Sequence, residues 1–161
     1  MSSSVLLQVD GDVTGKRAFT WEDLTAINPQ WQISDVSQLG TTRSGGAVWM
    51  RGILEAVKVC PEAKYITLHS KRDNFHASLP IDAILDRGMF IYRQQNQPLA
   101  AAAGGPIRFF IRDHTDCHNG EIDECANVKY VDRVEFSKQK GFDNRPLDDD
   151  AHEALHQQET P

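Results

Sequence analysis

The 161-residue sequence has no long apolar run, which argues against a membrane-spanning helix. Such a helix needs roughly 18 or more consecutive apolar residues, whereas the first apolar run covers only residues 5–7. The opening stretch, MSSSVLLQVDGD, also lacks the basic segment and apolar core of a secretory signal. We therefore expect a cytoplasmic protein with no membrane partner.

Cysteine is scarce, and there is no excess of basic charge. Cys60, Cys117 and Cys125 are an odd number in a chain without an export signal, which favours reduced thiols over a disulfide framework. The net charge is −6, of which residues 143–161 carry −5. Neither part offers the basic face that duplex nucleic acid requires, so we expect no nucleic-acid partner.

Several catalytic motifs are also absent. There is no Gly-x-Ser-x-Gly elbow, no phosphate-binding P-loop and no Gly-x-Gly-x-x-Gly fingerprint. The loop over residues 113–127 holds His114, Cys117, His118 and Cys125, which are residue types that bind zinc. Because this loop contains no Cys-x-x-Cys pair, a solvated acidic loop is the favoured interpretation and a metal site the alternative.

The sequence does contain many short strand patterns and a few short helical ones. Alternation of apolar and polar residues is clear in PIRFFIR, where Ile107, Phe109 and Ile111 share one face. Strands are predicted at 5–13, 64–70, 89–99, 106–112 and 128–136, an extended segment at 31–39, helices at 20–28, 47–60 and 79–88, and a charged loop at 71–78. These elements predict a single mixed, strand-rich α+β domain over residues 1–142. An acidic, flexible tail is predicted over residues 143–161.

Basic side chains recur beside glycine turns and strand ends. Arg43 lies among the glycines of GTTRSGG, His69 lies at the end of the strand at 64–70, Arg72 follows that strand, and Lys129 opens the last strand. Arg108 follows Gly104 and Gly105 in the turn AAAAGGP. Cations next to glycine backbone suit a phosphate or pyrophosphate group. Each of these residues also fits an ordinary exposed charge.

Read in order, these segments resemble the molybdopterin-binding domain of the sulfite oxidase family over residues 5–137. The matching stretches are VDGDVTGKRAFTWEDL, WMRGILEAV, SLPIDAILDRGMFIYRQQNQPL, AGGPIRFFI and VKYVDRVEF. The resemblance implies that fold and a molybdopterin cofactor. It also implies that the turn before Arg108 passes the pterin phosphate, with Arg108 and Lys129 as anion contacts, and that Arg43, His69, Arg72, Gly104 and Gly105 complete the cofactor site.

The sequence departs from this family at the metal. The family holds molybdenum through a cysteine in the loop before the Trp motif, and the corresponding LGTTRSGGAV has none. Ala103 stands where the family has a histidine. One hypothesis is therefore a divergent protein that binds a pterin or similar phosphorylated ligand without redox catalysis, or with altered metal ligation. The alternative is a non-catalytic scaffold that binds a protein partner through its acidic loop and tail.

Overall fold

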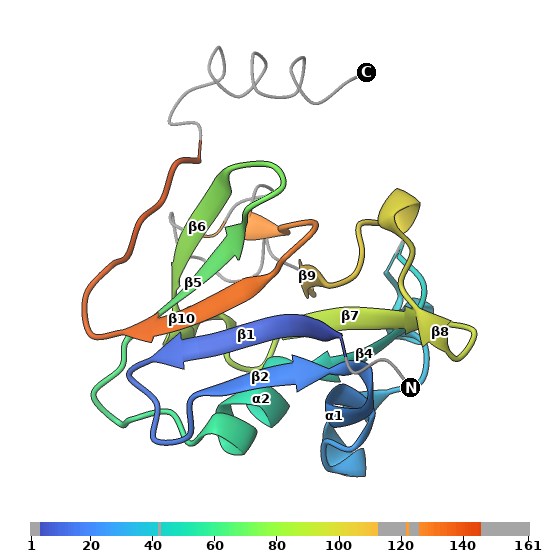
Figure 1. Ribbon diagram of the computed structural model, residues 1–161, viewed down its shortest axis with the longest axis horizontal. Coiled ribbons are helices and arrows are strands. Elements are labelled where there is room, and N and C mark those ends of the chain that lie inside the picture. Colours follow the sequence, from blue (N-terminus) through green and yellow to red (C-terminus); the bar gives the residue numbers. More distant parts are fainter. Residues whose placement is uncertain (1–3, 42, 113–121, 123–125, 146–161) are drawn as a thin grey trace.

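A computed structural model describes residues 4–41, 43–112, 122 and 126–145, which form two β-sheets flanked by short helices (Figure 1). The first sheet has the strand order β2–β1–β10–β5–β6. Its strands are β1 (Val5–Gly11), β2 (Arg17–Thr20), β5 (Tyr65–Ser70), β6 (Phe75–Pro80) and β10 (Arg133–Ser137). β1 and β10 are parallel, whereas the other neighbours in this sheet are antiparallel.

The second sheet is antiparallel and is centred on β7 (Gly88–Gln94). On one side β7 pairs with β4 (Gly46–Trp49), which in turn pairs with β3 (Gln32–Ile33). Its other partners are β8 (Gln97–Pro98) and β9 (Arg108–Ile111). Together the two sheets and the short helices confirm the predicted strand-rich α+β fold.

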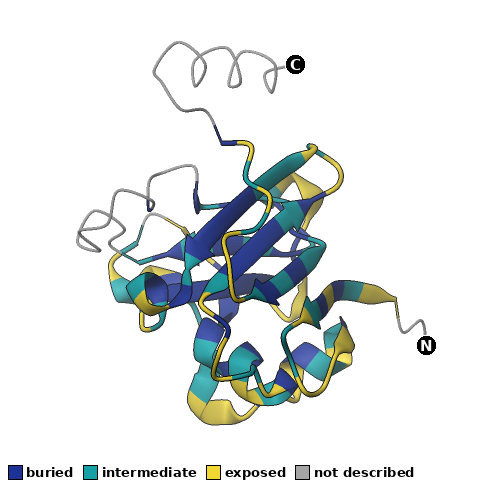
Figure 2. Ribbon diagram, turned by 90° about the vertical axis from the view of Figure 1, so that its left-hand side faces the viewer, coloured by how far each residue is buried: buried dark blue, intermediate teal, exposed yellow. Residues whose placement is uncertain are grey.

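One apolar core joins the two sheets. Phe19 and Phe136 from the first sheet are fully buried in the same cluster as Phe90 and Phe109 from the second. Figure 2 shows burial concentrated along the strands and exposure in the peripheral loops. A smaller cluster packs on the second sheet from Ile33, Val36, Ala47, Met89, Ile91 and Leu99. The first five residues of β7 are all buried, as expected for a strand covered on both faces.

The helices are short, and the first begins as the sequence predicts. α1 (Trp21–Thr25) has a complete capping box. The Thr20 hydroxyl accepts from the Asp23 backbone N–H at 3.2 Å, and the Asp23 carboxylate accepts from the Thr20 N–H at 3.0 Å. The other helices are α2 (Met50–Val57) and α3 (Ile81–Ile84). Within the described residues, no helix is long and apolar enough to cross a membrane.

Several predicted boundaries are wrong. Residues 47–49 belong to β4 rather than to a helix, and Gly88 begins β7 rather than ending the helix predicted at 79–88. The predicted loop at 71–78 is shorter, because β6 starts at Phe75 and pairs with β5. Of the extended segment at 31–39, only β3 is a strand, and Val36–Leu39 forms a 3₁₀ turn. The last strand begins at Arg133, after Tyr130 has adopted a φ of 56°.

Residues 141–145 cover the outer edge of β6, beside which Figure 1 draws them. The His76 N–H donates to the Asn144 side-chain oxygen at 2.8 Å, and the Asn144 N–H donates to the His76 carbonyl at 2.9 Å. The Ser78 N–H donates to the Asp143 carboxylate at 2.9 Å, and Arg145 Nη2 donates to the Ser78 carbonyl at 3.4 Å. Residues 143–145 thus supply hydrogen-bond partners that a further strand would supply. Three residues assigned to the tail, Asp143, Asn144 and Arg145, therefore contact the domain.

Candidate functional site

The alanine–glycine turn before β9 brings two stretches of backbone very close together. Ala101–Ala103 forms a 3₁₀ turn that ends at Gly104, whose φ of 97° lies in the left-handed region. A side-chain carbon at Gly105 would overlap the backbone carbonyl of Leu99. Both glycines therefore have a structural role, since one needs a positive φ and the other needs room for a neighbouring backbone.

Replacing Gly105 with alanine is expected to lower the free energy of unfolding by about 1–3 kcal/mol, the usual cost of forcing extra atoms into packed structure. Urea denaturation would measure the loss. Gly15→Ala is the matched control, because its added carbon would meet the Val57 carbonyl oxygen at 3.6 Å, an ordinary contact. Equal losses in the two variants would contradict this account of the turn.

Arg108 and Lys129 meet beside this turn. Arg108 donates from Nη1 to the Ala103 carbonyl oxygen at 3.2 Å. A side-chain carbon on Gly104 would lie 3.3 Å from both Arg108 Nη1 and Lys129 Cγ. The absence of a side chain at Gly104 therefore keeps open the space into which the two cationic side chains extend.

Two further arginines join them. Arg72 places its guanidinium carbon 4.0 Å from the centre of the Tyr130 ring, and Lys129 Nζ lies 5.9 Å from the same centre. Arg43 lies near enough to Arg108 for its charge to act on that side chain. We call Arg43, Arg72, Arg108 and Lys129 the cation cluster. The loops before β4, β6 and β10 and the start of β9 supply its members.

The cation cluster carries positive charge that no carboxylate among the described residues balances. Burial lowers the pKa of Arg108, and the charge of Arg43 lowers it further, while Tyr130 acts in the opposite direction. The buried Nε of Arg108 has no hydrogen-bond partner among the described residues. Within that part of the chain, none of the four cations forms an ion pair with a carboxylate. An anion would relieve this unfavourable charge.

His69 makes different contacts from the cation cluster. Its ring nitrogens lie 3.1 Å from a Glu135 carboxylate oxygen and 2.7 Å from Nδ1 of His76, both on neighbouring strands. Burial lowers the pKa of His76, and the nearby His69 lowers it further, while Asp132 raises it. The structure therefore groups five of the seven predicted site residues, Arg43, Arg72, Gly104, Arg108 and Lys129. Gly105 lies next to them in the turn, and both ring nitrogens of His69 face other partners.

Sequence reasoning missed Tyr130. Its backbone N–H donates to the Gly104 carbonyl at 2.9 Å, so it connects the segment before β10 to the glycine turn. Its ring supports the Arg72 guanidinium. The alternation in VKYVDRVEF predicts an ordinary strand position, and only the positive φ of Tyr130 reveals the special conformation. The one signal in the sequence that could have indicated its role is the neighbouring pair of a cation and an aromatic ring, Lys129 and Tyr130.

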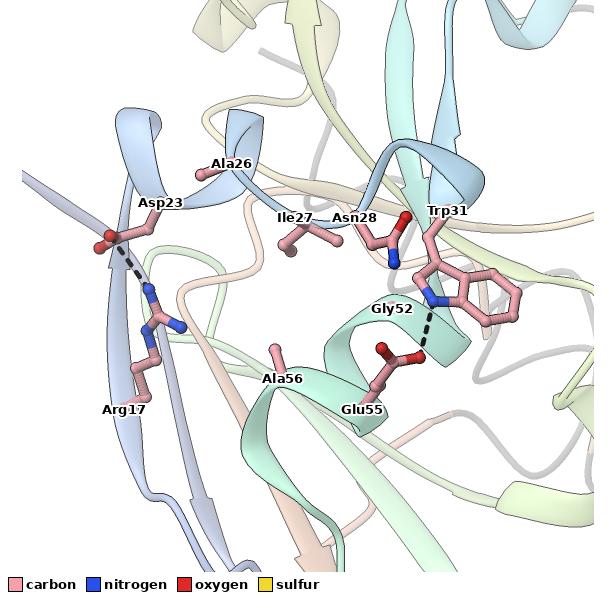
Figure 3. A pocket seen from close by; sticks show the side chains of 9 residues that line it. All are labelled: Arg17, Asp23, Ala26, Ile27, Asn28, Trp31, Gly52, Glu55 and Ala56. Atoms are coloured by element: carbon pink, nitrogen blue, oxygen red, sulfur yellow. Dashed lines mark hydrogen bonds and ion pairs between the residues drawn. The ribbon is translucent and has the colours of Figure 1, made fainter.

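A hollow of about 220 Å³ lies between α1 and α2 (Figure 3). Its charged groups are already paired: Arg17 with Asp23 at 3.1 Å, and the Trp31 indole N–H with the Glu55 carboxylate at 2.9 Å. Figure 3 shows these two pairs at opposite ends of the hollow. Because the charged side chains of this hollow already have hydrogen-bond partners, it is less suited to bind a charged ligand than the cation cluster is.

The described residues contain no group of three or more His, Cys, Asp or Glu side chains that could hold a metal ion. Cys60 lies in a hollow of about 530 Å³ with Trp31, Leu54 and Leu85, and no cation-cluster residue lines that hollow. The predicted acidic loop with His114, Cys117, His118 and Cys125 lies outside the described residues, as does the tail from residue 146 onward.

Comparison with known proteins agrees with the fold. Residues 2–144 match the family model described as the oxidoreductase molybdopterin binding domain. The structure is similar to sulfane dehydrogenase SoxCD from Paracoccus pantotrophus, with a TM-score of 0.61 and 17% identity over 87% of this chain. This chain corresponds to 40% of that chain, and at such an identity the likeness concerns the fold alone. No curated protein sequence matches the chain.

Proposed function

We propose, on the premise that the chain belongs to the family of oxidoreductase molybdopterin binding domains, that its cation cluster binds the phosphate group of a molybdopterin. In this proposal Arg43, Arg72, Arg108 and Lys129 neutralise the phosphate. Gly104 leaves room for the side chains of Arg108 and Lys129, and Tyr130 holds Arg72 in position.

The observation that carries this proposal is the half-buried charge of Arg108, which forms no ion pair with a carboxylate among the described residues. A buried cation without a partner is unfavourable, because water and opposite charge are both withheld from it. Its Nη1 already donates to the Ala103 carbonyl, whereas Nε has no partner among the described residues. A guanidinium presents its donors in a planar fork that matches phosphate oxygens. A phosphate would thus supply both the missing charge and the missing acceptor.

The residues present suit the phosphate of the cofactor better than its metal. The loop before β4 contains Arg43, Ser44 and Gly45, and no cysteine occurs in residues 40–46. A thiolate ligand fixes the reactivity of a bound metal, and here none is available at that position. We therefore propose binding of the pterin and derive no redox step from these residues.

The test uses the full chain purified from a host that makes molybdopterin. Pterin would be released by oxidation and measured by fluorescence, and molybdenum would be measured by mass spectrometry on the same sample. Pterin near one equivalent is the expected result. Molybdenum in the same sample would mean that a ligand other than the family's cysteine holds the metal. Absence of pterin would overturn the proposal and turn attention to a protein partner bound through the acidic loop and tail. No contact among the described residues bears on that alternative.

A further inference from the structure

The outer face of the first sheet carries a pair of histidines that the proposed function does not use. His69 on β5 and His76 on β6 stand directly opposite each other in the strand register. Their Nδ1 atoms are 2.7 Å apart, and the rings meet edge to face with centres 5.0 Å apart. The alternate residues of β5, Ile66 and Leu68, point the other way into the core.

The far nitrogen of each ring has its own acceptor. His69 Nε2 lies 3.1 Å from a Glu135 carboxylate oxygen, and His76 Nε2 lies 3.3 Å from the side-chain oxygen of Asn74. A carboxylate and a carboxamide oxygen only accept hydrogen bonds, so both Nε2 atoms are assigned as donors. A neutral imidazole carries one N–H. Each Nδ1 of a neutral ring in this arrangement therefore presents a lone pair toward the other.

Two lone pairs that face each other at 2.7 Å require a positive charge between them. A shared proton meets this need, and so does a metal ion that prefers imidazole nitrogen, such as Zn²⁺ or Cu²⁺. We propose that His69 and His76 form a binding site for a divalent transition-metal ion, with Nδ1 of each ring as a ligand. Nitrogen–metal distances of about 2.0–2.1 Å would separate the two Nδ1 atoms to roughly 3.3 Å, a small opening of the hairpin.

The surroundings match those of metal-binding histidines, whose second nitrogen usually donates to a carboxylate or another oxygen. Glu135 plays that part for His69, and Arg133 Nη2 lies 3.7 Å from the same Glu135 oxygen. Arg133 in turn binds Asp10 through two nitrogens at 3.0 Å. The Phe142 ring packs edge-on against His76 at 4.8 Å and shields one side. Since the described residues supply no third ligand of the usual kinds, water completes the coordination.

Cu²⁺ is the probe that tests this proposal, with the full chain purified free of metal. One equivalent is expected to bind, with nitrogen hyperfine coupling in the electron paramagnetic resonance spectrum. A His69→Gln, His76→Gln double variant should lose that site. A second variant, with His114 and His118 changed to Gln and Cys117 and Cys125 changed to Ser, should keep it. The reverse pattern, or no Cu²⁺ binding by the wild type, would overturn the proposal.

The affinity for Cu²⁺ also tests whether Glu135 positions the His69 ring for metal binding. Glu135→Gln removes the charge but keeps an acceptor for His69, so Cu²⁺ should bind roughly 10- to 100-fold more weakly. Glu62→Gln, at an exposed position, is the matched control and should leave the affinity unchanged. If the double variant fails to fold, imidazole ¹⁵N spectra of the wild type with Zn²⁺ decide the matter. Shifts at both His69 and His76 support the site, and unshifted signals refute it.

Discussion

Arg108→Ala is expected to reduce molybdopterin retention by roughly 10- to 100-fold. A hydrogen bond to a charged group contributes about 1.5–3 kcal/mol, and each 1.4 kcal/mol changes an affinity about tenfold. The loss should fall in this range because Arg108 is a half-buried member of the cation cluster, and its Nε has no hydrogen-bond partner among the described residues. Pterin fluorescence of protein purified from a molybdopterin-making host measures the effect.

Two further variants make that result specific. Arg108→Lys keeps the charge but not the planar fork, so its retention should lie between those of the wild type and the alanine variant. Arg51→Ala is the matched control, because Arg51 pairs with Asp86 at 2.6 Å and lines none of the cluster. Retention as high in Arg108→Ala as in the wild type would remove Arg108 from the site.

Asp143→Ala is expected to lower the free energy of unfolding by about 3 kcal/mol at neutral pH. Asp143 and Arg145 approach to 2.7 Å with side chains only 12% and 7% exposed. Breaking a buried ion pair from one side costs about 3–5 kcal/mol, because a buried charge loses a carboxylate partner. The substitution also takes the carboxylate acceptor away from the Ser78 N–H. Urea denaturation of the two proteins measures the difference.

This loss should depend on pH in a definite direction. Burial raises the pKa of Asp143, but hydrogen bonds from Arg145 and from the Ser78 N–H outweigh it, so the net pKa lies below the ordinary value of 3.8. The folded state therefore binds the proton less readily than the unfolded chain does. The stabilisation is complete above pH 3.8 and is lost as the pH falls through the lowered pKa.

The control for Asp143 is an exposed ion pair of the same chemistry. Asp86 is 76% exposed and pairs with Arg51. Asp86→Ala should change the free energy of unfolding by no more than about 1 kcal/mol, since solvent screens such pairs. Similar losses from both substitutions, or a loss from Asp143→Ala that stays constant down to pH 2, would refute the assigned role of Asp143.

The sequence predicts those parts of the fold whose causes are local. The Thr20–Asp23 capping box depends on residues three apart, and the alternation in β9 depends on immediate neighbours. β6 escapes such reasoning because the charged residues 71–73 open the same segment and favour a loop. Its strand character comes from pairing with β5 and from residues 141–145, more than 60 positions away. Residues 47–49 read as part of a helix because a strand buried on both faces has no alternation.

The candidate site likewise has features that the local sequence predicts and features that depend on residues far apart in the chain. The placement of basic residues beside glycine turns and strand ends predicts four candidates, Arg43, Arg72, Arg108 and Lys129. Only the tertiary structure brings them together. Strand periodicity places His69 at a strand end and does not indicate which neighbouring strand its ring will face. That information resides in the register of β5 with β6 and β10. The sequence thus indicates the chemistry of each side chain, whereas the assembled sheets determine which side chains contact one another.

The covering of β6 by residues 141–145 has a consequence for synthesis of the chain. The β5–β6 hairpin is local and can form once residue 80 has left the ribosome, because short loops close quickly. β10, the other neighbour of β5, is complete only about 57 residues later, and the covering residues only about 65 residues later. During that interval the nascent hairpin displays two unpaired edges, which are templates for pairing with other chains. Residues 141–145 end this exposure as the last described part of the domain to emerge.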